Sequence, residues 1–209
     1  MNPLHLYLGF LGLFAAERGV ELALSRRNAR RALARGAVEF GRGHYRPMVI
    51  LHALFFAACA AEALLHPRPP PPAALLAAAG ALLAQGLRWW SIASLGDRWN
   101  TRILVVPGDE PVTRGPYRRL RHPNYLAVVL EMALVPLAWG SWRTALAFSV
   151  GNALLLAVRI PAESRAVHAW APAVPAPRPP APHLERVLPA PPGPDLDRRA
   201  RRGGAGGRT

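Results

Sequence analysis

The apolar positions of this 209-residue chain gather into five long runs that are separated by shorter polar stretches. An α-helix needs about 20 mostly apolar residues to cross the hydrocarbon layer of a membrane. The runs therefore predict five membrane-spanning helices, at residues 4–24, 45–65, 73–95, 126–138 and 144–160. The fourth run is short for a full crossing, and Asn124 and Tyr125 extend it. We expect an all-α integral membrane protein whose last two spans form a helical hairpin.

The arginines lie between the apolar runs and favour one side of the predicted membrane. Residues 26–46, expected to form a loop or a short surface helix, carry seven arginines against one acidic residue. Residues 96–121 carry six arginines against three acidic residues. Membrane proteins keep such basic loops in the cytoplasm. With five spans, we therefore predict a multi-pass plasma-membrane protein with its N-terminus outside and its C-terminus in the cytoplasm.

The net charge of +14 comes from 26 arginines and no lysine, and it raises nucleic-acid binding as an alternative. A nucleic-acid-binding protein presents its basic residues on the face of a soluble fold. Here the arginines lie between hydrophobic segments, so we expect no nucleic-acid partner. Cys59 is the single cysteine, which excludes an internal disulfide and a cysteine-based metal site. We expect it to be a small core residue, and we predict no metal.

The composition changes after residue 170. Residues 172–194 contain ten prolines, and the last residues are rich in arginine and glycine. Such a segment buries too little apolar surface to offset the entropy lost on ordering. We predict a membrane-embedded domain at residues 1–170 and a disordered tail at 171–209, whose basic end contacts anionic lipid headgroups.

Several ionisable side chains fall inside the predicted spans. Glu17 and Glu21 are four residues apart and share a helix face. An ionisable group within the membrane often marks a functional site. The alternative is that these carboxylates lie near the interface and pair with Arg18 or with later arginines. Gln85 and Arg88 are expected to satisfy a neighbour rather than to touch a substrate. The second span is interrupted by two further polar residues, His52 and Glu62.

The most distinctive stretch, residues 112–131, is a basic, histidine-bearing loop that runs directly into an apolar helix. Its arginines are either ordinary anchors at the membrane interface, with Pro123 starting the helix, or residues that bind a charged cofactor. No Gly-x-Gly-x-x-Gly follows a predicted strand, so the nucleotide-binding sheet of soluble methyltransferases is not expected. A cofactor would have to lie between helix ends and cytoplasmic loops.

Three motifs carry a resemblance to a known family. They read Leu-Gly-Asp-Arg-Trp at residues 95–99, Gly-Pro-Tyr-Arg at 115–118 and Arg-His-Pro-Asn-Tyr at 121–125. Together they resemble the isoprenylcysteine carboxyl methyltransferase (ICMT) family of integral-membrane methyltransferases, over roughly residues 87–163. Within that range, Arg-Ile-Pro-Ala-Glu at residues 159–163 is similar to the family's Arg-Ile-x-x-Glu-Glu.

A fourth segment resembles a bacterial branch of the family. Residues 25–31 and 36–45 match the corresponding segment of members that are encoded beside type III polyketide synthases and methylate long-chain alkylpyrones. By this resemblance we expect a lipophilic acceptor, contact with membrane lipids and a polyketide synthase as a functional partner. His44 and Tyr45 either line the substrate mouth or anchor the chain at the membrane interface.

The resemblance implies an S-adenosylmethionine-dependent O-methyltransferase. It places His122 and Tyr125 at the cofactor. Because the acceptor oxygen carries negative charge, we expect Arg159 to orient it, and Glu163 to orient Arg159 or to bind the cofactor. The alternative is that residues 159–163 form a salt-bridged helix end. The remaining residues expected on the cofactor wall or next to it are Tyr117, Arg121, Pro123 and Glu131.

Two alternatives to an alkylpyrone-type acceptor stay open. The first is a prenylcysteine carboxyl O-methyltransferase, against which no residue of this chain discriminates. The second is a non-catalytic membrane scaffold or a decayed homologue. It is favoured by Ser164, which replaces the family's second glutamate, and by proline-rich sequence where the family continues as a helix.

Overall fold

The computed structural model describes residues 2–67 and 69–170, so the predicted tail at 171–209 lies outside the described residues. Five α-helices account for most of the described chain, as the apolar runs predict. They are α1 (Pro3–Ala34), α2 (Arg42–Leu65), α3 (Ala74–Leu95), α4 (Pro123–Leu137) and α5 (Trp142–Trp170). Two short 3₁₀ turns lie in the long loop before α4, namely η1 (Gly96–Arg98) and η2 (Gly115–Arg118).

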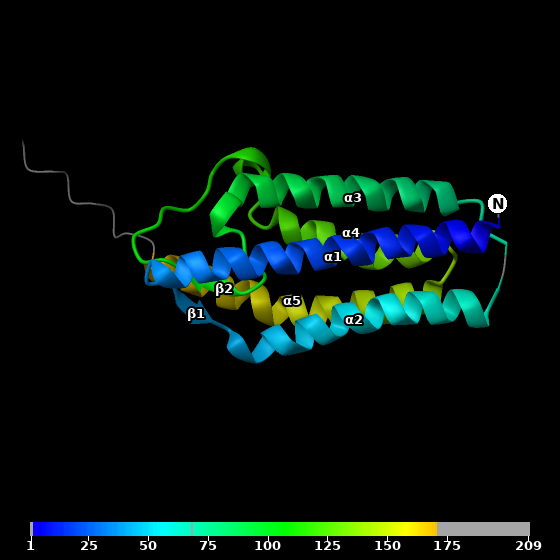
Figure 1. Ribbon diagram of the computed structural model, residues 1–209, viewed down its shortest axis with the longest axis horizontal. Helices are drawn as coiled ribbons and strands as arrows, with labels where there is room; N and C mark the ends of the chain where they lie inside the picture. The colour runs from blue at the N-terminus through cyan, green and yellow to red at the C-terminus, as the bar shows by residue number, and fades with distance from the viewer. Residues whose placement is uncertain (1, 68, 171–209) are drawn as a thin grey trace, which may run out of the picture. The chain divides into compact units, whose positions relative to one another are not determined.

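The helices of the domain lie side by side (Figure 1). α3 packs against α4, α4 against α5 and α5 against α2, while α1 lies along the bundle and contacts α2. The N-terminus lies at one end of the bundle, and the long loop between α3 and α4 lies at the other (Figure 1). α4 and α5 are joined by a tight turn at Gly140, so the predicted helical hairpin is present.

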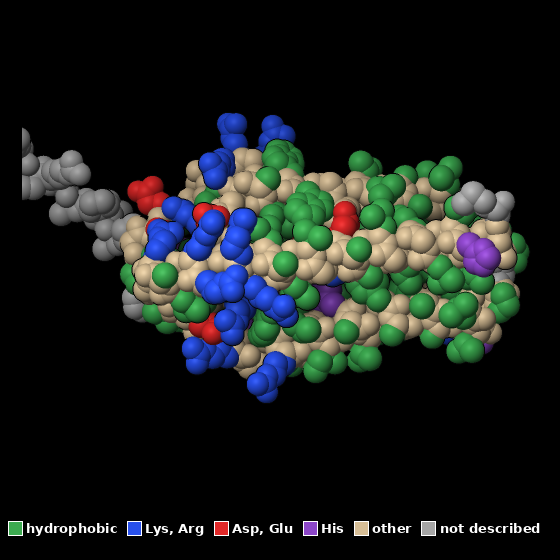
Figure 2. Space-filling view, viewed as in Figure 1, with side chains coloured by type: hydrophobic (Ala, Val, Ile, Leu, Met, Phe, Trp, Pro, Cys, Tyr) green, Lys and Arg blue, Asp and Glu red, His purple; other side chains and the backbone are tan. Residues whose placement is uncertain are grey.

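Within the part of the chain that the structure describes, two helices are long and apolar enough to cross a membrane. α2 has a mean hydropathy of 2.1, and residues Trp142–Ala169 of α5 have 1.6. α4 is a shorter apolar helix. Large apolar side chains such as Leu75 and Leu83 of α3 are exposed. Figure 2 shows hydrophobic side chains over the half of the bundle away from the cluster of arginines. An outer surface of this kind suits lipid contact.

α1 is longer than the predicted span of residues 4–24. It continues to Ala34 because polar residues of its last turns are buried against the loop after α3. Asn28 donates to the carbonyl oxygen atoms of Gly96 and Trp99, at 3.1 and 2.8 Å. These long-range hydrogen bonds cannot be seen in a local pattern, so only part of the expected loop at residues 26–46 exists as a loop.

The prediction of an all-α protein is wrong in one detail. β1 (Val38–Phe40) and β2 (Ile103–Val105) form an antiparallel pair in which Glu39 faces Leu104. Three-residue strands are too short to show the alternation that identifies a strand in a sequence. Gly36, which adopts the left-handed region at a φ of 82°, turns the chain out of α1 and into β1. The pair joins the two arginine-rich stretches of the sequence.

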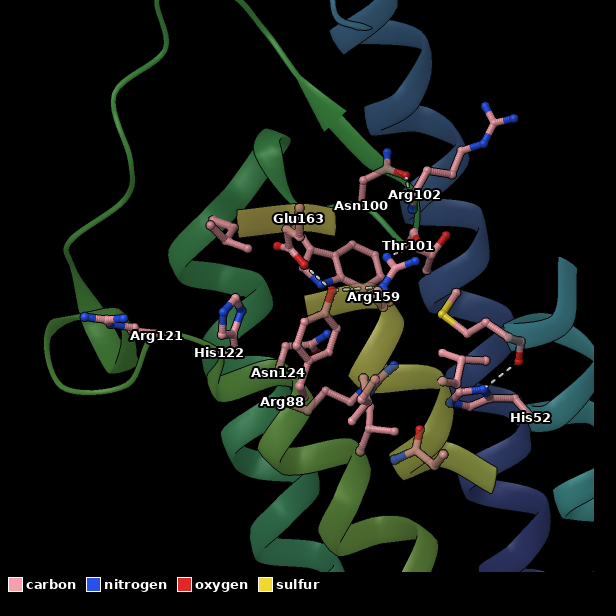
Figure 3. A pocket seen from close by; sticks show the side chains of 18 of the residues that line it. His52, Arg88, Asn100, Thr101, Arg102, Arg121, His122, Asn124, Arg159 and Glu163 are labelled. Carbon is pink, nitrogen blue, oxygen red and sulfur yellow. Dashed lines mark hydrogen bonds between the residues drawn. The ribbon is translucent and has the colours of Figure 1, made fainter. Parts of the chain in front are cut away.

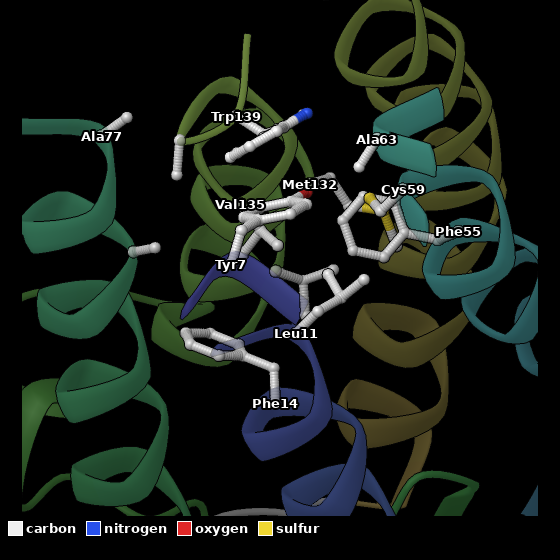
Figure 4. Packing of buried hydrophobic residues seen from close by; sticks show 13 residues of the cluster. Tyr7, Leu11, Phe14, Phe55, Cys59, Ala63, Ala77, Met132, Val135 and Trp139 are labelled. Carbon is white, nitrogen blue, oxygen red and sulfur yellow. The ribbon is translucent and has the colours of Figure 1, made fainter. Parts of the chain in front are cut away.

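The hydrophobic core lies in the half of the bundle that contains the N-terminus (Figure 4). Tyr7 of α1 stacks on Trp139 after α4, with ring centroids 5.3 Å apart. Cys59 is fully buried, as expected of a small core residue. Glu62 accepts hydrogen bonds from the backbone N–H and hydroxyl of Thr144, at 3.0 and 2.6 Å, and so ties α2 to the first turn of α5. The opposite half of the bundle is left for polar side chains.

Candidate active site

A cavity of about 160 Å³ lies where the loop after α3 meets the ends of α4 and α5 (Figure 3). We call it the polar cavity. Six of the residues predicted for the site line it, and they come from three of the quoted motifs, at residues 115–118, 121–125 and 159–163. They are Tyr117, Arg121, His122, Tyr125, Arg159 and Glu163. The structure therefore brings together most of the residues that the family motifs single out, while their roles stay predictions.

The Gly-Pro-Tyr-Arg motif forms η2 and packs it closely on the end of α3. Gly115 has a φ of +59°, and a Cβ atom placed on it would lie 2.0 Å from the hydroxyl oxygen of Ser94. Only glycine fits this contact. Arg114 then donates from Nε to the carbonyl oxygen of Ser94 at 2.8 Å. The turn brings Tyr117 to the wall of the cavity.

The Arg-His-Pro-Asn-Tyr motif crosses from the loop into α4. Pro123 is the first residue of the helix and is fully buried, so it shapes the wall without lining the cavity. The rings of His122 and Tyr125 stack with centroids 5.4 Å apart and an interplanar angle of 23°. Arg121 is exposed, and Figure 3 shows its side chain directed away from the centre of the cavity.

Arg159, Tyr125 and Glu163 form one hydrogen-bonded network. Arg159 donates from Nε to the Tyr125 hydroxyl at 2.9 Å and from Nη2 to the Thr101 carbonyl oxygen at 2.6 Å. The Tyr125 hydroxyl in turn donates to Glu163. Arg159 is only 4% exposed, and its guanidinium lies 5.8 Å from the centroid of the Tyr125 ring. Glu163 is thus linked to Arg159 through Tyr125.

Tyr117 lies beside this network as a neutral phenol. Its burial, together with the nearby carboxylate of Glu163, raises the pKa of Tyr117 above the usual range of a tyrosine. A hydrogen bond with Ser91 opposes this shift but does not outweigh it. The rings of Tyr117, His122 and Tyr125 therefore line the cavity without an added negative charge from the Tyr117 phenol.

Glu131 does not line the polar cavity. It belongs to a buried ionic cluster with Arg18 and Glu21 of α1 and Arg88 of α3. Arg88 makes two hydrogen bonds of 2.6 Å to Glu21, and Arg18 donates to Glu21 at 3.0 Å. Glu131 lies 3.5 Å from Arg18 and 4.0 Å from Arg88. Its position is that of a counter-charge, and a role at the cofactor stays a prediction.

The same cluster contains the partners of several polar side chains that were predicted to lie within the spans. Glu21 pairs with Arg18, which is the pairing alternative stated for it, and Arg88 satisfies a neighbour as expected. Gln85 also accepts a hydrogen bond from Arg18, at 2.8 Å. The cluster joins α1, α3 and α4 next to the polar cavity, and Arg88 lines that cavity as well.

Several residues of the polar cavity were not among the residues predicted for the site. Three of them carry buried atoms that lack a hydrogen bond among the described residues. These atoms are the Trp99 indole nitrogen, Asn124 Oδ1 and Arg88 Nη1. Buried polar atoms are nearly always paired in proteins. Two donors and one acceptor without partners at one cavity are what a polar ligand would satisfy. Trp99 and Asn124 fall inside the quoted motifs, which was the available signal.

Comparison with known proteins places the chain in a family. A sequence profile described as the isoprenylcysteine carboxyl methyltransferase (ICMT) family matches residues 75–169. The chain belongs to this family. The match spans α3 to α5 and includes every motif residue of the polar cavity. Membership implies a membrane methyltransferase, which agrees with the predicted enzyme class and with the apolar helices.

Two relatives of the chain come from bacteria. The uncharacterized protein YpbQ of Bacillus subtilis (strain 168) is 42% identical over 160 residues, which cover 77% of this chain and 95% of YpbQ. An uncharacterized protein of Haemophilus influenzae (strain ATCC 51907 / DSM 11121 / KW20 / Rd) is 27% identical over 153 residues, 73% of this chain and 89% of that protein. Similarity to YpbQ therefore extends well beyond the residues that match the family profile.

Proposed function

We propose that this member of the ICMT family is an S-adenosylmethionine-dependent O-methyltransferase. Its acceptor is the hydroxyl of a lipophilic molecule, such as an alkylpyrone-type polyketide. The observation that carries the proposal is the Arg159–Tyr125–Glu163 network, which shares one cavity with the stacked rings of His122 and Tyr125. The cavity lies within the part of the chain that matches the family.

The chemistry of the cavity fits the cofactor. The rings of Tyr117 and His122 suit the adenine base, since aromatic faces stack on it. The unpaired Trp99 indole N–H can donate to a carboxylate, and Asn124 Oδ1 can accept from an ammonium group. Glu163 and the face of Tyr125 suit a positively charged sulfonium. When bound, S-adenosylmethionine supplies an electrophilic methyl group.

Arg159 is the residue that we expect to hold the acceptor oxygen. Its Nε and Nη2 atoms are fixed by Tyr125 and by the Thr101 carbonyl, which leaves Nη1 without a hydrogen bond among the described residues. A fixed, buried guanidinium donor binds an oxygen with negative character strongly and in one orientation. Holding the reacting oxygen in line is a large contribution to such a displacement.

The acceptor's hydrocarbon chain is assigned to a second, more apolar cavity between α1 and α2. This cavity, which we call the α1–α2 groove, holds about 310 Å³, within the usual range of ligand pockets. It is lined by apolar residues such as Leu22, Val49 and Phe56. The groove and the polar cavity share four lining residues, and so the two are adjacent. The shared residues are Met48, His52, Arg88 and Thr101.

Calorimetric binding of S-adenosylmethionine to the detergent-purified protein tests the cofactor assignment. His122→Ala should weaken binding about tenfold or more, because a stacked ring of the wall is lost. His5→Ala is the matched control, since His5 is exposed on α1 and does not line the cavity. A folded protein that binds no cofactor would favour the scaffold alternative.

Transfer of a labelled methyl group then tests the acceptor. An alkylpyrone and a prenylcysteine, offered separately, distinguish the two enzyme classes. Methylation of the prenylcysteine alone would contradict the proposed hydroxyl acceptor.

A further inference from the structure

His52 stands at the junction of the two cavities. It lies in the middle of α2 and is one of the four residues that line both the polar cavity and the α1–α2 groove. Figure 3 shows it on the side of the polar cavity opposite His122. An acceptor with its chain in the groove and its polar head in the polar cavity would therefore lie beside this side chain. The residue lies outside the stretch that matches the family.

The tautomer of His52 follows from its one hydrogen bond. The ring atom Nδ1 lies 2.8 Å from the carbonyl oxygen of Met48, one turn earlier in the helix. A carbonyl oxygen only accepts, so Nδ1 must carry the proton and donate. In the neutral ring, Nε2 is then a bare acceptor. Among residues 2–67 and 69–170, Nε2 has no hydrogen-bond partner.

The other shared residues do not offer a comparable acceptor. Arg88 only donates, and a methionine sulfur such as that of Met48 is a weak acceptor. The Thr101 hydroxyl already lies within hydrogen-bond distance of two other hydroxyls, those of Ser25 at 2.8 Å and Tyr45 at 3.5 Å. Among the four shared residues, His52 Nε2 is therefore the strongest hydrogen-bond acceptor that is available to a ligand, whereas Arg88 supplies hydrogen-bond donors.

We propose that the hydroxyl group of the methyl acceptor donates a hydrogen bond to His52 Nε2. This bond makes the site selective for a polar head group that carries a proton to donate. A methyl ether has no proton to donate at this point. The same atom would thus discriminate between the acceptor and its methylated product. The product cannot make this hydrogen bond and therefore dissociates more readily. A carboxylate, which only accepts, would face the lone pair of Nε2. This inference rests on the proposed function, because it takes the hydroxyl acceptor from there.

Two substitutions separate the two ring nitrogens. His52→Asn keeps a side-chain amide N–H near the position of Nδ1, so it can still donate to Met48, but it ends short of Nε2. His52→Gln places an amide oxygen near the position of Nε2 and gives up the bond to Met48. A purely structural histidine should be replaced better by asparagine, whereas an acceptor-binding histidine should be replaced better by glutamine.

The test is equilibrium binding of a long-chain alkylphenol and of its methyl ether to the protein in lipid nanodiscs, without cofactor. The phenol keeps its proton at neutral pH, as the tyrosine side chain does. The natural protein should bind the phenol about fivefold to tenfold more tightly than the ether, as one net hydrogen bond allows. H52Q should keep much of this preference, and H52N should bind both ligands alike.

The outcomes distinguish this inference from the proposed function. An H52N protein that retains the full preference for the phenol overturns the role of His52 and leaves the proposed function standing. A natural protein that binds S-adenosylmethionine but neither ligand overturns the proposed acceptor, and the role of His52 with it. Cofactor binding by both variants, measured in the same samples, shows that each is folded.

Discussion

The two buried polar groups of this bundle differ in how completely their charges are paired. The ionic cluster of Arg18, Glu21, Arg88 and Glu131 contains two cations and two anions that contact one another, and of its side-chain atoms Arg88 Nη1, at the polar cavity, is buried without a hydrogen bond among the described residues. The Arg159–Tyr125–Glu163 network is also linked internally, and it borders the same cavity, where buried atoms of Trp99 and Asn124 likewise have no hydrogen bond among the described residues. Internal pairing is typical of a structural role, whereas unpaired atoms at a cavity indicate a ligand. Substitutions in each of the two groups test this difference.

The largest effect is expected from Glu21→Ala, which should destabilise the protein by about 3–5 kcal/mol. Removing this carboxylate leaves Arg88 and Arg18 buried with too little negative charge. Thermal unfolding in detergent measures the loss. Asp97→Asn is the control, since Asp97 pairs with Arg31 at the surface and should change stability by less than about 1 kcal/mol. A stable Glu21→Ala protein would contradict a structural role for the cluster.

Arg159→Lys should lower the rate of methyl transfer by about 10²–10³-fold while the protein stays folded. Lysine keeps the charge but cannot make the two bonds that fix the guanidinium, to Tyr125 and to the Thr101 carbonyl. Single-turnover methylation, compared with cofactor affinity, measures the effect. An equal loss of cofactor affinity and rate would show that Arg159 acts on the cofactor and not on the acceptor.

Tyr125→Phe should have a smaller effect, about a 10- to 100-fold loss of rate. The substitution removes the hydroxyl that links Arg159 to Glu163, and hydrogen bonds to charged groups contribute about 1.5–3 kcal/mol. The ring itself remains to stack on His122, so cofactor binding should change little. Calorimetry and the methylation rate, taken together, separate the two contributions. A large loss of cofactor binding would place the hydroxyl at the cofactor.

The smallest effect is expected from Gly19→Leu, which should lower affinity for long-chain acceptors about tenfold and spare short ones. Gly19 lines the α1–α2 groove, and a Cβ atom placed on it meets nothing within 4 Å. The leucine would therefore occupy the groove without distorting α1. Gly12→Leu is the control, because Gly12 has the same space around it but does not line the groove. Equal loss for all chain lengths would contradict a chain-binding groove.

The helices were predictable because their apolar runs are long, whereas their ends were not. α1 extends past its apolar run through Asn28, whose partners Gly96 and Trp99 come from a distant loop. The β1–β2 pair was missed for the same reason. Each strand is too short to show its pattern alone, and the pairing exists only once the bundle has formed.

The site was predictable where a motif placed several chemically related residues together. Tyr125 and Glu163 do meet in the structure, although each comes from a different motif. Glu131 was placed near the cofactor because it follows the same helix, yet it faces the cations of α1 and α3. His52 was visible in the sequence only as a polar interruption of the second span, because a single histidine in an apolar run shows no partner. Its position at the junction depends on how α1 and α2 pack against the loop.

The bond between Arg159 and the Thr101 carbonyl has an evolutionary consequence. It uses a backbone oxygen, which every amino acid carries, so residue 101 can change identity without removing it. What must be inherited is the path of the chain, held there by Ser25 and Asn100 and by the β1–β2 pair. Selection on such a contact falls on distant residues. Lineages of this enzyme can therefore share the position of the arginine while their loop sequences drift apart.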